Sequence, residues 1–457
     1  MLFSTWSFLL FIISTVLIFS FVKSIKGKII TLLIFSIIFA SWKNPLHAAI
    51  LLWVIFFDYF LIKKINNSEK KRLWLYLSII NSISILAIFK YSLLILTSLN
   101  EILQLADVSL RLPVINFQAP TGLSFFIFIS MGYVIDSYYG RLQQEKNFAI
   151  HGLFVSFFAQ ISAGPIARAS NLIPQLKSLS HLKKENLIIG FNLFVYGLFK
   201  KQALADYFAL FSDKIFSNPA NFSSGDLILG ALAFTWQIYF DFSGYTDMAR
   251  GVAKLFGIDL MENFRLPYMA ASTGDFWSRW HISLSSWFRD YLYIPLGGNR
   301  SGRIKEIRNI MLTMILSGLW HGAAWNFLLW GSIHGVLHVA SKLISSVKLI
   351  SYIPLSIKRI LIFIVIVFTW IFFKAETATD AFDFIYGIFS FNFKSTDIPP
   401  FMIALMIIAY IHHWLKEYRI IEFMERDIIK TILSCLMIFY IIFFCSGNLS
   451  DFIYFQF

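Results

Sequence analysis

The chain has 457 residues, of which 58% are hydrophobic and only 14% charged, and it carries a formal net charge of +13 at pH 7. This number of charged side chains is too small to cover the surface of a soluble globular protein. The composition therefore excludes a soluble protein and predicts a polytopic membrane protein. The 39 basic residues stand in short groups between apolar segments, which favours membrane topology over a nucleic-acid-binding patch as the origin of the charge.

The first apolar segment, Trp6 to Val22, has neither a charged leading region nor a small-residue cleavage site, so we expect a retained span and no signal peptide. Further apolar segments follow at Ile29–Trp42, Leu46–Ile62, Leu73–Leu99, Thr121–Tyr139, Leu187–Leu210, Leu227–Phe256, Ile310–Trp330, Ile357–Phe373, Phe401–Leu415 and Ile429–Phe444. At about 20 residues per crossing, they predict roughly ten to twelve transmembrane helices.

Basic residues alternate between the loops. Three lysines follow the first span and five basic residues lie between Lys63 and Arg72, whereas the Asn100 to Pro120 loop holds two acidic residues and one arginine. Because positively charged loops stay in the cytoplasm, we expect the N-terminus to lie outside it.

Two segments are too short or too polar to span, His151–Gly164 and Asp275–Leu296. We expect re-entrant or interfacial helices there, which protein must shelter or which must line a cavity. No soluble domain is apparent, so residues 1–457 are expected to form a single membrane domain, with N-terminal helices at 1–120, a core at 121–377 and C-terminal helices at 378–457. Cys435 and Cys445 lack metal spacing and are expected to be buried small side chains.

Polar residues within apolar surroundings carry the most information, because an ionisable group at bilayer depth costs roughly 2.5 to 3.5 kcal/mol. Asp241 and Asp247 lie in one helical run, about 240° apart around the helix, so paired acid and base chemistry between them is not expected. The two carboxylates also have a structural explanation without catalysis. It is either an Asp247–Arg250 ion pair or hydrogen bonds to neighbouring helices.

The Asp275–Leu296 segment is amphipathic if it forms one helix. One stripe holds Arg279, Ser283, Ser286 and Asp290, and the opposite stripe holds Trp277, His281, Leu284 and Phe288. His281 therefore lies with the aromatic residues, and by itself it resembles a hydrogen-bonded structural histidine more than a catalyst. The aromatic side chains would also suit a helix at the membrane surface.

His321 stands among small residues, with Ser317 and Gly318 one turn before it and Ala324 and Trp325 one turn after it. Small residues let membrane helices pack closely, but they would equally give a ligand access to the imidazole. A desolvated neutral imidazole can act as a general base. A Ser317–His321 nucleophile pair is geometrically possible, although no third, orienting group is apparent in the local sequence.

The remaining histidines do not predict a metal site. His334 and His338 are spaced i, i+4, but no carboxylate accompanies them as in a metalloprotease helix. His321 and His334 would lie about 220° apart on a continuous helix, so the three rings would not converge.

Several motifs occur in order along most of the chain. They are "GLSFFIFISMGYVIDSYYGR" (122–141), "QISAGPIAR" (160–168), "GLFKKQALAD" (197–206), "DFSGYTDMARGVAKLFGIDLMENFRLPY" (241–268), "DFWSRWHISLSSWFRDYLYIPLGGNR" (275–300), "GLWHGAAWNFLLWGSIHG" (318–335), "TWIFFKAET" (369–377) and the terminal "FIYFQF". They resemble the membrane-bound O-acyltransferase (MBOAT) superfamily, in particular the bacterial branch that acts in alginate O-acetylation, peptidoglycan O-acetylation and teichoic-acid D-alanylation.

This resemblance implies a fold in which tilted transmembrane helices surround re-entrant and interfacial helices that form a central channel. It matches His321 to the family's catalytic histidine and His281 to its second characteristic polar position. An acyl thioester would enter from the cytoplasm and an acceptor hydroxyl from outside, with His321 as general base. The residues expected to line the channel or support the site, some of them as oxyanion donors, are Trp320, Asn326, Ser317, Arg279, Asp290 and Asp241.

The resemblance also implies the substrates. Acetyl-CoA is the expected donor, an envelope glycan the final acceptor, and a separate extracytoplasmic acyltransferase or acyl-acceptor protein the partner. The chain itself is expected in the bacterial cytoplasmic membrane. Transfer of D-alanine from a carrier protein to teichoic acid is the first alternative. A non-catalytic lipid or polymer transporter is the alternative of another class.

Overall fold

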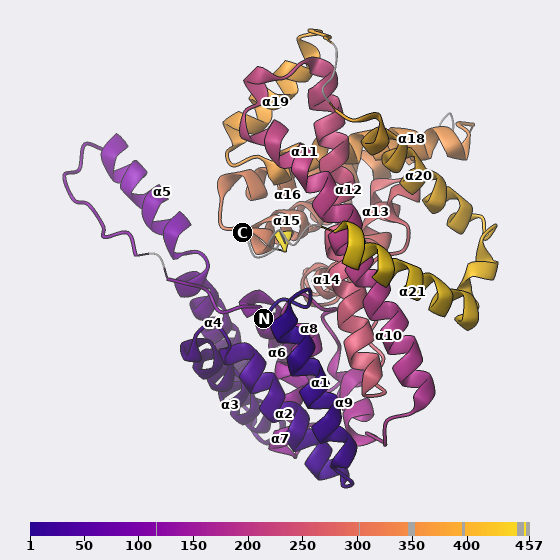
Figure 1. The fold of residues 1–457 in the computed structure, drawn as a ribbon. Helices are drawn as coiled ribbons and strands as arrows, with labels where there is room; N and C mark the ends of the chain where they lie inside the picture. Colours follow the sequence, from indigo (N-terminus) through magenta and orange to yellow (C-terminus); the bar gives the residue numbers. More distant parts are fainter. Residues whose placement is uncertain (116, 301, 346–351, 395–397, 446–451, 454–457) are drawn as a thin grey trace. The chain divides into compact units, whose positions relative to one another are not determined.

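The computed structural model describes residues 1–115, 117–300, 302–345, 352–394, 398–445 and 452–453, and within these ranges it contains helices and no strand (Figure 1). The chain divides into two compact units, one made of Met1–Phe191 and Ala249–Met261, the other of Asn192–Met248 and Glu262–Phe457. The helices α10 (Lys184–Phe199) and α12 (Ser224–Leu255) contribute to both units. The division into segments at 1–120, 121–377 and 378–457 stays a prediction.

Six of the described helices are long and apolar enough to cross a membrane, by length and composition: Pro45–Asn67, Lys71–Phe89, Lys184–Ser217, Trp325–Ile344, Leu355–Lys374 and Asp427–Phe444. Shorter apolar helices cover Trp6–Phe21, Ser92–Leu105, Leu123–Tyr138 and Phe148–Ile161. The chain is therefore an all-helical membrane protein with several crossings, as the composition predicts.

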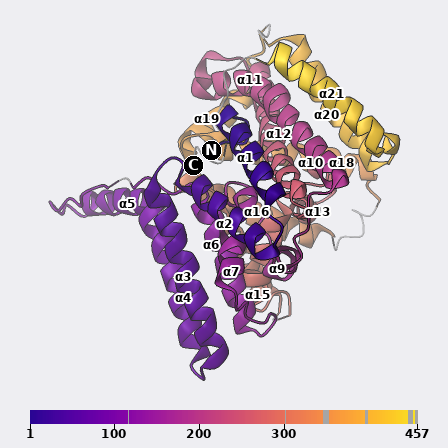
Figure 2. The ribbon, with the colours of Figure 1, turned by 60° about the horizontal axis from the view of Figure 1, so that its bottom comes forward.

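The first unit contains α1 (Trp6–Phe21), α2 (Ile25–Ser41), α3 (Pro45–Asn67), α4 (Lys71–Phe89), α5 (Ser92–Leu105), α6 (Leu123–Tyr138), α7 (Phe148–Ser156), α8 (Phe158–Ile161) and α9 (Ala169–Lys177). The start of α3 follows from local chemistry, since Pro45 occupies the first turn and the Asn44 side chain accepts a hydrogen bond from the Leu46 amide. The helices α3 and α4 run side by side as a hairpin (Figure 2).

A buried carboxyl group joins three helices of this unit. Asp58 of α3 has no exposed surface and accepts hydrogen bonds from Ser78 of α4 (2.8 Å) and Ser130 of α6 (2.6 Å). These two bonds satisfy a polar group that would otherwise be costly at this depth. Asp58 therefore has a structural explanation within the helix bundle.

The segment predicted to be sheltered, His151–Gly164, falls in α7, α8 and the residues after them, and all residues from 150 to 167 are buried. Gly122, which precedes α6 with a φ of +76°, makes this arrangement possible, because a Cβ there would lie 1.7 Å from the carbonyl oxygen of Ile161. The expectation that protein covers this short helical segment is confirmed.

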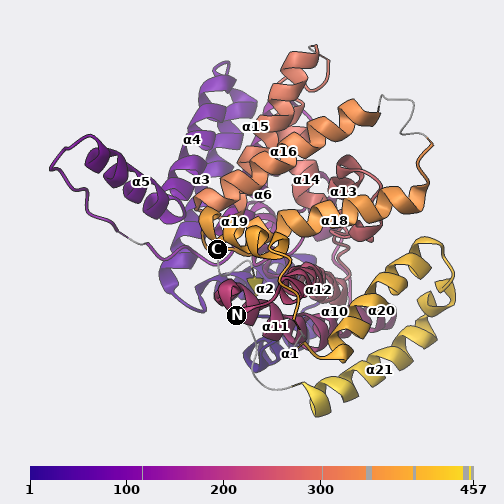
Figure 3. The ribbon, with the colours of Figure 1, turned by 90° about the horizontal axis from the view of Figure 1, so that it is seen from above.

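The second unit contains η1 (Lys200–Ala205), α11 (Asp206–Ser217), η2 (Pro219–Asn221), η3 (Pro267–Met269), α13 (Thr273–Arg279), α14 (Ile282–Phe288), η4 (Arg289–Tyr293), α15 (Arg303–His321), α16 (Trp325–Ser345), α18 (Leu355–Lys374), α19 (Ala378–Phe389), α20 (Pro400–Glu417), η5 (Glu422–Glu425) and α21 (Asp427–Phe444). The helices α15 and α16 lie side by side (Figure 3).

Three predicted helices are interrupted. The Leu73–Leu99 segment breaks at Lys90 and Tyr91, between α4 and α5, so part of the loop expected at Asn100–Pro120 is helical. The Ile310–Trp330 segment ends as a helix at His321 and begins again at Trp325, and the Asp275–Leu296 segment divides into α13, α14 and the π-helical turn η4.

Two further expectations about single residues are wrong. Lys28, expected in a basic loop, is buried in α2 with its Nζ 5.3 Å from the centroid of the Phe19 ring. Cys435 is exposed on α21 and Cys445 is half-buried. A membrane helix exposes apolar side chains outward as well as inward, so an apolar setting in the sequence does not imply burial within protein.

Candidate functional site

Three of the predicted site residues lie together in the second unit. The ring centroids of His281 and His321 are 6.5 Å apart, and Trp320 lies 5.8 Å from His281 and 5.1 Å from His321. All three side chains are buried, with 3% exposure or less. Sequence positions forty residues apart thus form one aromatic and imidazole cluster, which is hereafter called the histidine cluster.

His281 interrupts the helix that the sequence predicts. Its φ of +42° and ψ of 54° place it in the left-handed region, between the end of α13 and the start of α14. The two-stripe arrangement on one continuous helix is therefore wrong, because this backbone turns the chain and separates Arg279 from Asp290. The aromatic environment predicted for His281 is confirmed, since its ring lies 4.6 Å from that of Phe242 on α12.

Two hydrogen bonds to Asn263 hold the chain immediately after His281. The Asn263 backbone oxygen accepts from the Ile282 amide (3.0 Å), and its side-chain oxygen accepts from the Ser283 amide (3.1 Å). Burial lowers the pKa of the His281 imidazole to about 3, so the ring is neutral at physiological pH. A neutral imidazole can donate one hydrogen bond and accept another.

His321 is the last residue of α15, and the chain after it is extended at Gly322. Ala324 and Trp325 therefore do not lie one helical turn beyond His321, and the angular argument that separated His321 from His334 does not apply. A Cβ at Gly322 would lie 2.1 Å from the Phe327 ring, so the close packing of that ring requires glycine at this position.

The small residues before His321 serve helix packing. A Cβ at Gly318 would lie 2.2 Å from the Phe327 carbonyl oxygen and 3.1 Å from the Gly331 Cα, so α15 and α16 cross in near-backbone contact there. Ser317 is buried one turn before His321. Of the two interpretations that the small residues allowed, Gly318 supports close packing.

Aromatic rings enclose the other sides of His321. Its ring centroid lies 5.1 Å from that of Trp330 on α16 and 5.5 Å from that of Phe373 on α18. Trp330 also contacts the buried ring of His334, at 4.7 Å. Among the described residues, no three His, Cys, Asp or Glu side chains converge as a metal-binding group.

The other predicted residues lie in separate contacts. Asn326 donates through Nδ2 to the Ala375 carbonyl oxygen (2.8 Å), so this amide group links α16 to the end of α18 and is not free to serve as an oxyanion donor. Asp290, in η4, accepts a hydrogen bond from Arg289 (2.8 Å). Arg279, at the end of α13, contacts Asp275 and Glu417.

Asp241 belongs to a buried ion-pair network. Lys201 of η1 lies 2.8 Å from Asp241 and 2.9 Å from Asp206, and the adjacent Lys200 lies 2.7 Å from Asp247. Asp247 therefore bonds to Lys200 on a neighbouring helical segment. Such a bond between helices was the second of the two structural alternatives for Asp247. The amide of Ile453, within the described part of the terminal motif, also donates to Asp241 (2.8 Å).

Residues that the sequence did not indicate complete the surroundings. Asn263 hydrogen-bonds to the backbone after His281, and Trp330 packs against His321. Lys201 pairs with the predicted residue Asp241, and Glu417 pairs with the predicted residue Arg279 and with Arg359. Lys201 belongs to the "GLFKKQALAD" motif, so the family resemblance could have indicated this residue from the sequence. Glu417 stands in no motif, and its partners lie far away in the sequence.

These features define a helical membrane protein with several crossings and two buried histidines in an aromatic cluster. A model of the membrane-bound O-acyltransferase family matches residues 143–377, just over half of the chain. The chain belongs to this family, and it is therefore a membrane O-acyltransferase. Both histidines lie within the matched region.

Known relatives divide into two levels of similarity. The probable alginate O-acetylase AlgI of Azotobacter vinelandii is 34% identical over 90% of this chain and 84% of the relative, and the peptidoglycan O-acetyltransferase of Helicobacter pylori is 35% identical over 79% and 73%. The teichoic acid D-alanyltransferase of Bacillus subtilis is 30% identical over 47% of this chain and 57% of the relative. The O-acetylating relatives therefore share more of the chain.

Proposed function

We propose that the protein transfers an acetyl group from acetyl-CoA toward a hydroxyl group of an envelope glycan, such as peptidoglycan or an alginate-like exopolysaccharide. The observation that carries this proposal is the buried contact of His281, Trp320 and His321. The chain that holds it is matched over 90% of its length by the Azotobacter relative and over 79% by the Helicobacter relative. Family membership argues against a transporter without covalent chemistry.

The chemistry would proceed at His321. Its imidazole removes the proton of the acceptor hydroxyl as that oxygen attacks the thioester carbonyl, the carbon–sulfur bond breaks, and the proton leaves with the CoA thiol. The surrounding rings of Trp320, Trp330 and Phe373 exclude water from this reaction. Proton transfer by a positioned base contributes about 10² to 10⁴ in rate, and alignment of the two substrates supplies the rest.

The neighbours of His321 have separate supporting tasks. His281 and Trp320, whose rings neighbour the His321 ring, are the candidate donors to the developing oxyanion, because the Asn326 amide is engaged by Ala375. Asp241 supports the site through its ion pair with Lys201, which holds α12 in place. The residue after Asp241 is Phe242, whose ring packs on His281. Ser317 and Asp290 remain candidate channel residues.

The extent of similarity favours acetyl over D-alanyl transfer, because the D-alanyl relative matches less than half of this chain. A separate extracytoplasmic acyltransferase would receive the group and complete its transfer to the glycan.

We place the protein in the cytoplasmic membrane of a bacterium, with the start of α1 outside the cytoplasm. The alternating basic loops support this orientation.

The test uses purified protein in lipid vesicles with radiolabelled acetyl-CoA and a surrogate hydroxyl acceptor that takes the place of the partner acyltransferase. His321→Ala should reduce transfer at least about 100-fold, which is the lower range for loss of a general base. His181→Ala, the same change at an exposed histidine, should leave transfer unchanged. Intact transfer by a folded His321→Ala protein would exclude the mechanism, and uptake of acetyl-CoA without thioester cleavage would favour a transporter.

A further inference from the structure

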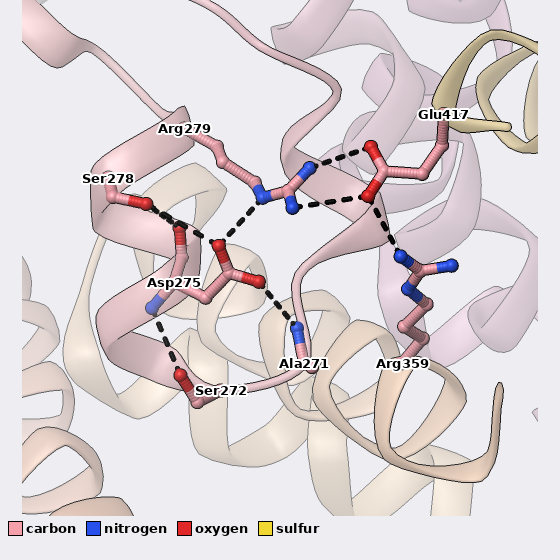
Figure 4. Close-up of polar contacts among 7 residues, drawn as sticks. All are labelled: Ala271, Ser272, Asp275, Ser278, Arg279, Arg359 and Glu417. Atoms are coloured by element: carbon pink, nitrogen blue, oxygen red, sulfur yellow. Dashed lines mark hydrogen bonds and ion pairs between the residues drawn. The ribbon is translucent and has the colours of Figure 1, made fainter. Parts of the chain in front are cut away.

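Glu417, the last residue of α20, holds Arg279 in a two-bond contact (Figure 4). Arg279 donates through Nη1 to Oε2 (2.9 Å) and through Nη2 to Oε1 (3.2 Å). A paired contact of this kind fixes the direction of the guanidinium as well as its distance. Both side chains are mostly shielded from solvent, at 22% and 18% exposure.

The remaining guanidinium nitrogen of Arg279 is held within its own helix. It donates to Asp275 Oδ1 (2.7 Å), while Asp275 Oδ2 accepts from the Ala271 amide (3.0 Å). Figure 4 shows the guanidinium between the two carboxylates. All three nitrogens of Arg279 are therefore engaged, and its position is fixed relative to both α13 and α20.

A second arginine prevents Glu417 from moving away. Arg359 of α18 donates through Nη2 to Glu417 Oε1 (2.8 Å) and through Nη1 to the Tyr418 hydroxyl (3.1 Å). Two arginines and the carboxylates of Asp275 and Glu417 balance in charge, so this network holds three helices together without a net buried charge.

The network ends two residues before His281, a chain length of about 7 Å at most. The Arg279 carbonyl oxygen also accepts from the Arg265 amide (2.9 Å). His281 itself has the left-handed backbone that is costly for a residue with a Cβ. A strained conformation persists only where its surroundings hold it, and Arg279 is the nearest charged anchor on its N-terminal side.

We infer that Glu417 is a positioning residue for the acyl transfer reaction: through Arg279 it fixes the α13–α14 junction, and thereby the His281 ring against His321. This inference rests on the proposed function. Glu417 lies beyond the region that the family model matches, residues 143–377, so a C-terminal helix outside that region controls the geometry of the site.

The first experiment compares Glu417→Gln with Glu422→Gln. Glutamine retains the shape of the side chain but removes the charge that pairs with both arginines. Because a displacement of about 1 Å can reduce the rate about 100-fold, we expect kcat to fall at least about tenfold with KM nearly unchanged. Glu422 pairs only loosely with Arg419 (3.6 Å) on the exposed surface, so its variant should behave as wild type.

The second measurement does not depend on activity. Hydrogen–deuterium exchange followed by mass spectrometry should show faster exchange at the Ile282 and Ser283 amides in Glu417→Gln, because their bonds to Asn263 open more often. Peptides of the α3–α4 hairpin should exchange as in wild type. Equal acceleration in both regions, or an unchanged kcat, would overturn the inference.

A double variant separates positioning from independent roles. If Glu417 acts through Arg279, then Arg279→Gln combined with Glu417→Gln should lose no more activity than Arg279→Gln alone. Additive losses would overturn the inference. Absence of acyl transfer in wild type would reject the proposed function instead, and the exchange measurement would still decide whether Glu417 holds the junction.

Discussion

At the residue scale, His281 combines two properties that a substitution can separate. Its ring packs between Phe242 and Trp320, and its backbone occupies the left-handed region with φ +42°. A β-carbon in that region costs roughly 1 to 2 kcal/mol. The chain accepts this cost at a position where the ring faces His321, which indicates that the junction serves the site as well as the fold.

We therefore predict that His281→Gly is more stable than His281→Ala by about 1 kcal/mol, because glycine adopts this backbone without strain. Both variants remove the ring, so both should lose acyl transfer to the same extent. Thermal unfolding of the purified proteins in detergent measures the difference. Equal stability of the two variants would mean that the junction relaxes to another conformation once the ring is removed.

At the element scale, the crossing of α15 and α16 positions His321. Gly318 and Gly331 face each other across it, since a Cβ at Gly331 would lie 3.2 Å from the Gly318 Cα. His321 follows Gly318 by three residues, within one turn of the same helix. A shift of α15 at the crossing would therefore move the imidazole relative to Trp330 and Phe373.

Gly318→Ala should destabilise the protein by about 1 to 3 kcal/mol, because the added methyl group meets the backbone of α16, which cannot rotate away. Acyl transfer should fall as well, since the helices must separate next to His321. Gly225→Ala is the matched control, because the nearest atoms to its added methyl group lie 3.7 Å away. Unfolding temperature and transfer rate should both stay at wild-type values in that control.

The sequence predicts helix positions well wherever lipid-facing hydropathy alone decides them. The segments expected at Ile357–Phe373 and Ile429–Phe444 correspond to α18 and α21 within two residues at each end. It could not predict the breaks after His321 and at His281, because an apolar pattern continues through the first and an amphipathic pattern through the second. The contacts beside these breaks, with Phe327 and Asn263, leave no periodic signal in the sequence.

The candidate site shows the same limit. The motifs indicated His281, Trp320 and His321, which the structure brings together. They could not show that Asn326 and Asp241 bond to partners on other helices, nor single out Glu417. The two arginines that contact Glu417 are 138 and 58 residues away in the chain, and pairing over such distances leaves no local pattern.

At the scale of the whole molecule, the distribution of basic residues predicts the direction of the chain through the membrane. The turn between α3 and α4 carries lysines on both sides, with Lys63 and Lys64 exposed before it and Lys70 and Lys71 after it. Both helices are apolar enough to cross a membrane. Retention of positive charge in the cytoplasm would place this turn inside and the segment after α5 outside.

Cysteine labelling in intact cells tests this orientation. After Cys435→Ala and Cys445→Ala remove the native thiols, Ser109→Cys should react with a membrane-impermeant maleimide, because this exposed position follows α5. Glu69→Cys, in the lysine-flanked turn, should react only once the membrane is permeabilised. The reverse pattern would invert the proposed orientation, and equal labelling of both positions in intact cells would mean that α4 does not cross the membrane. The orientation also decides from which side each substrate would approach His321.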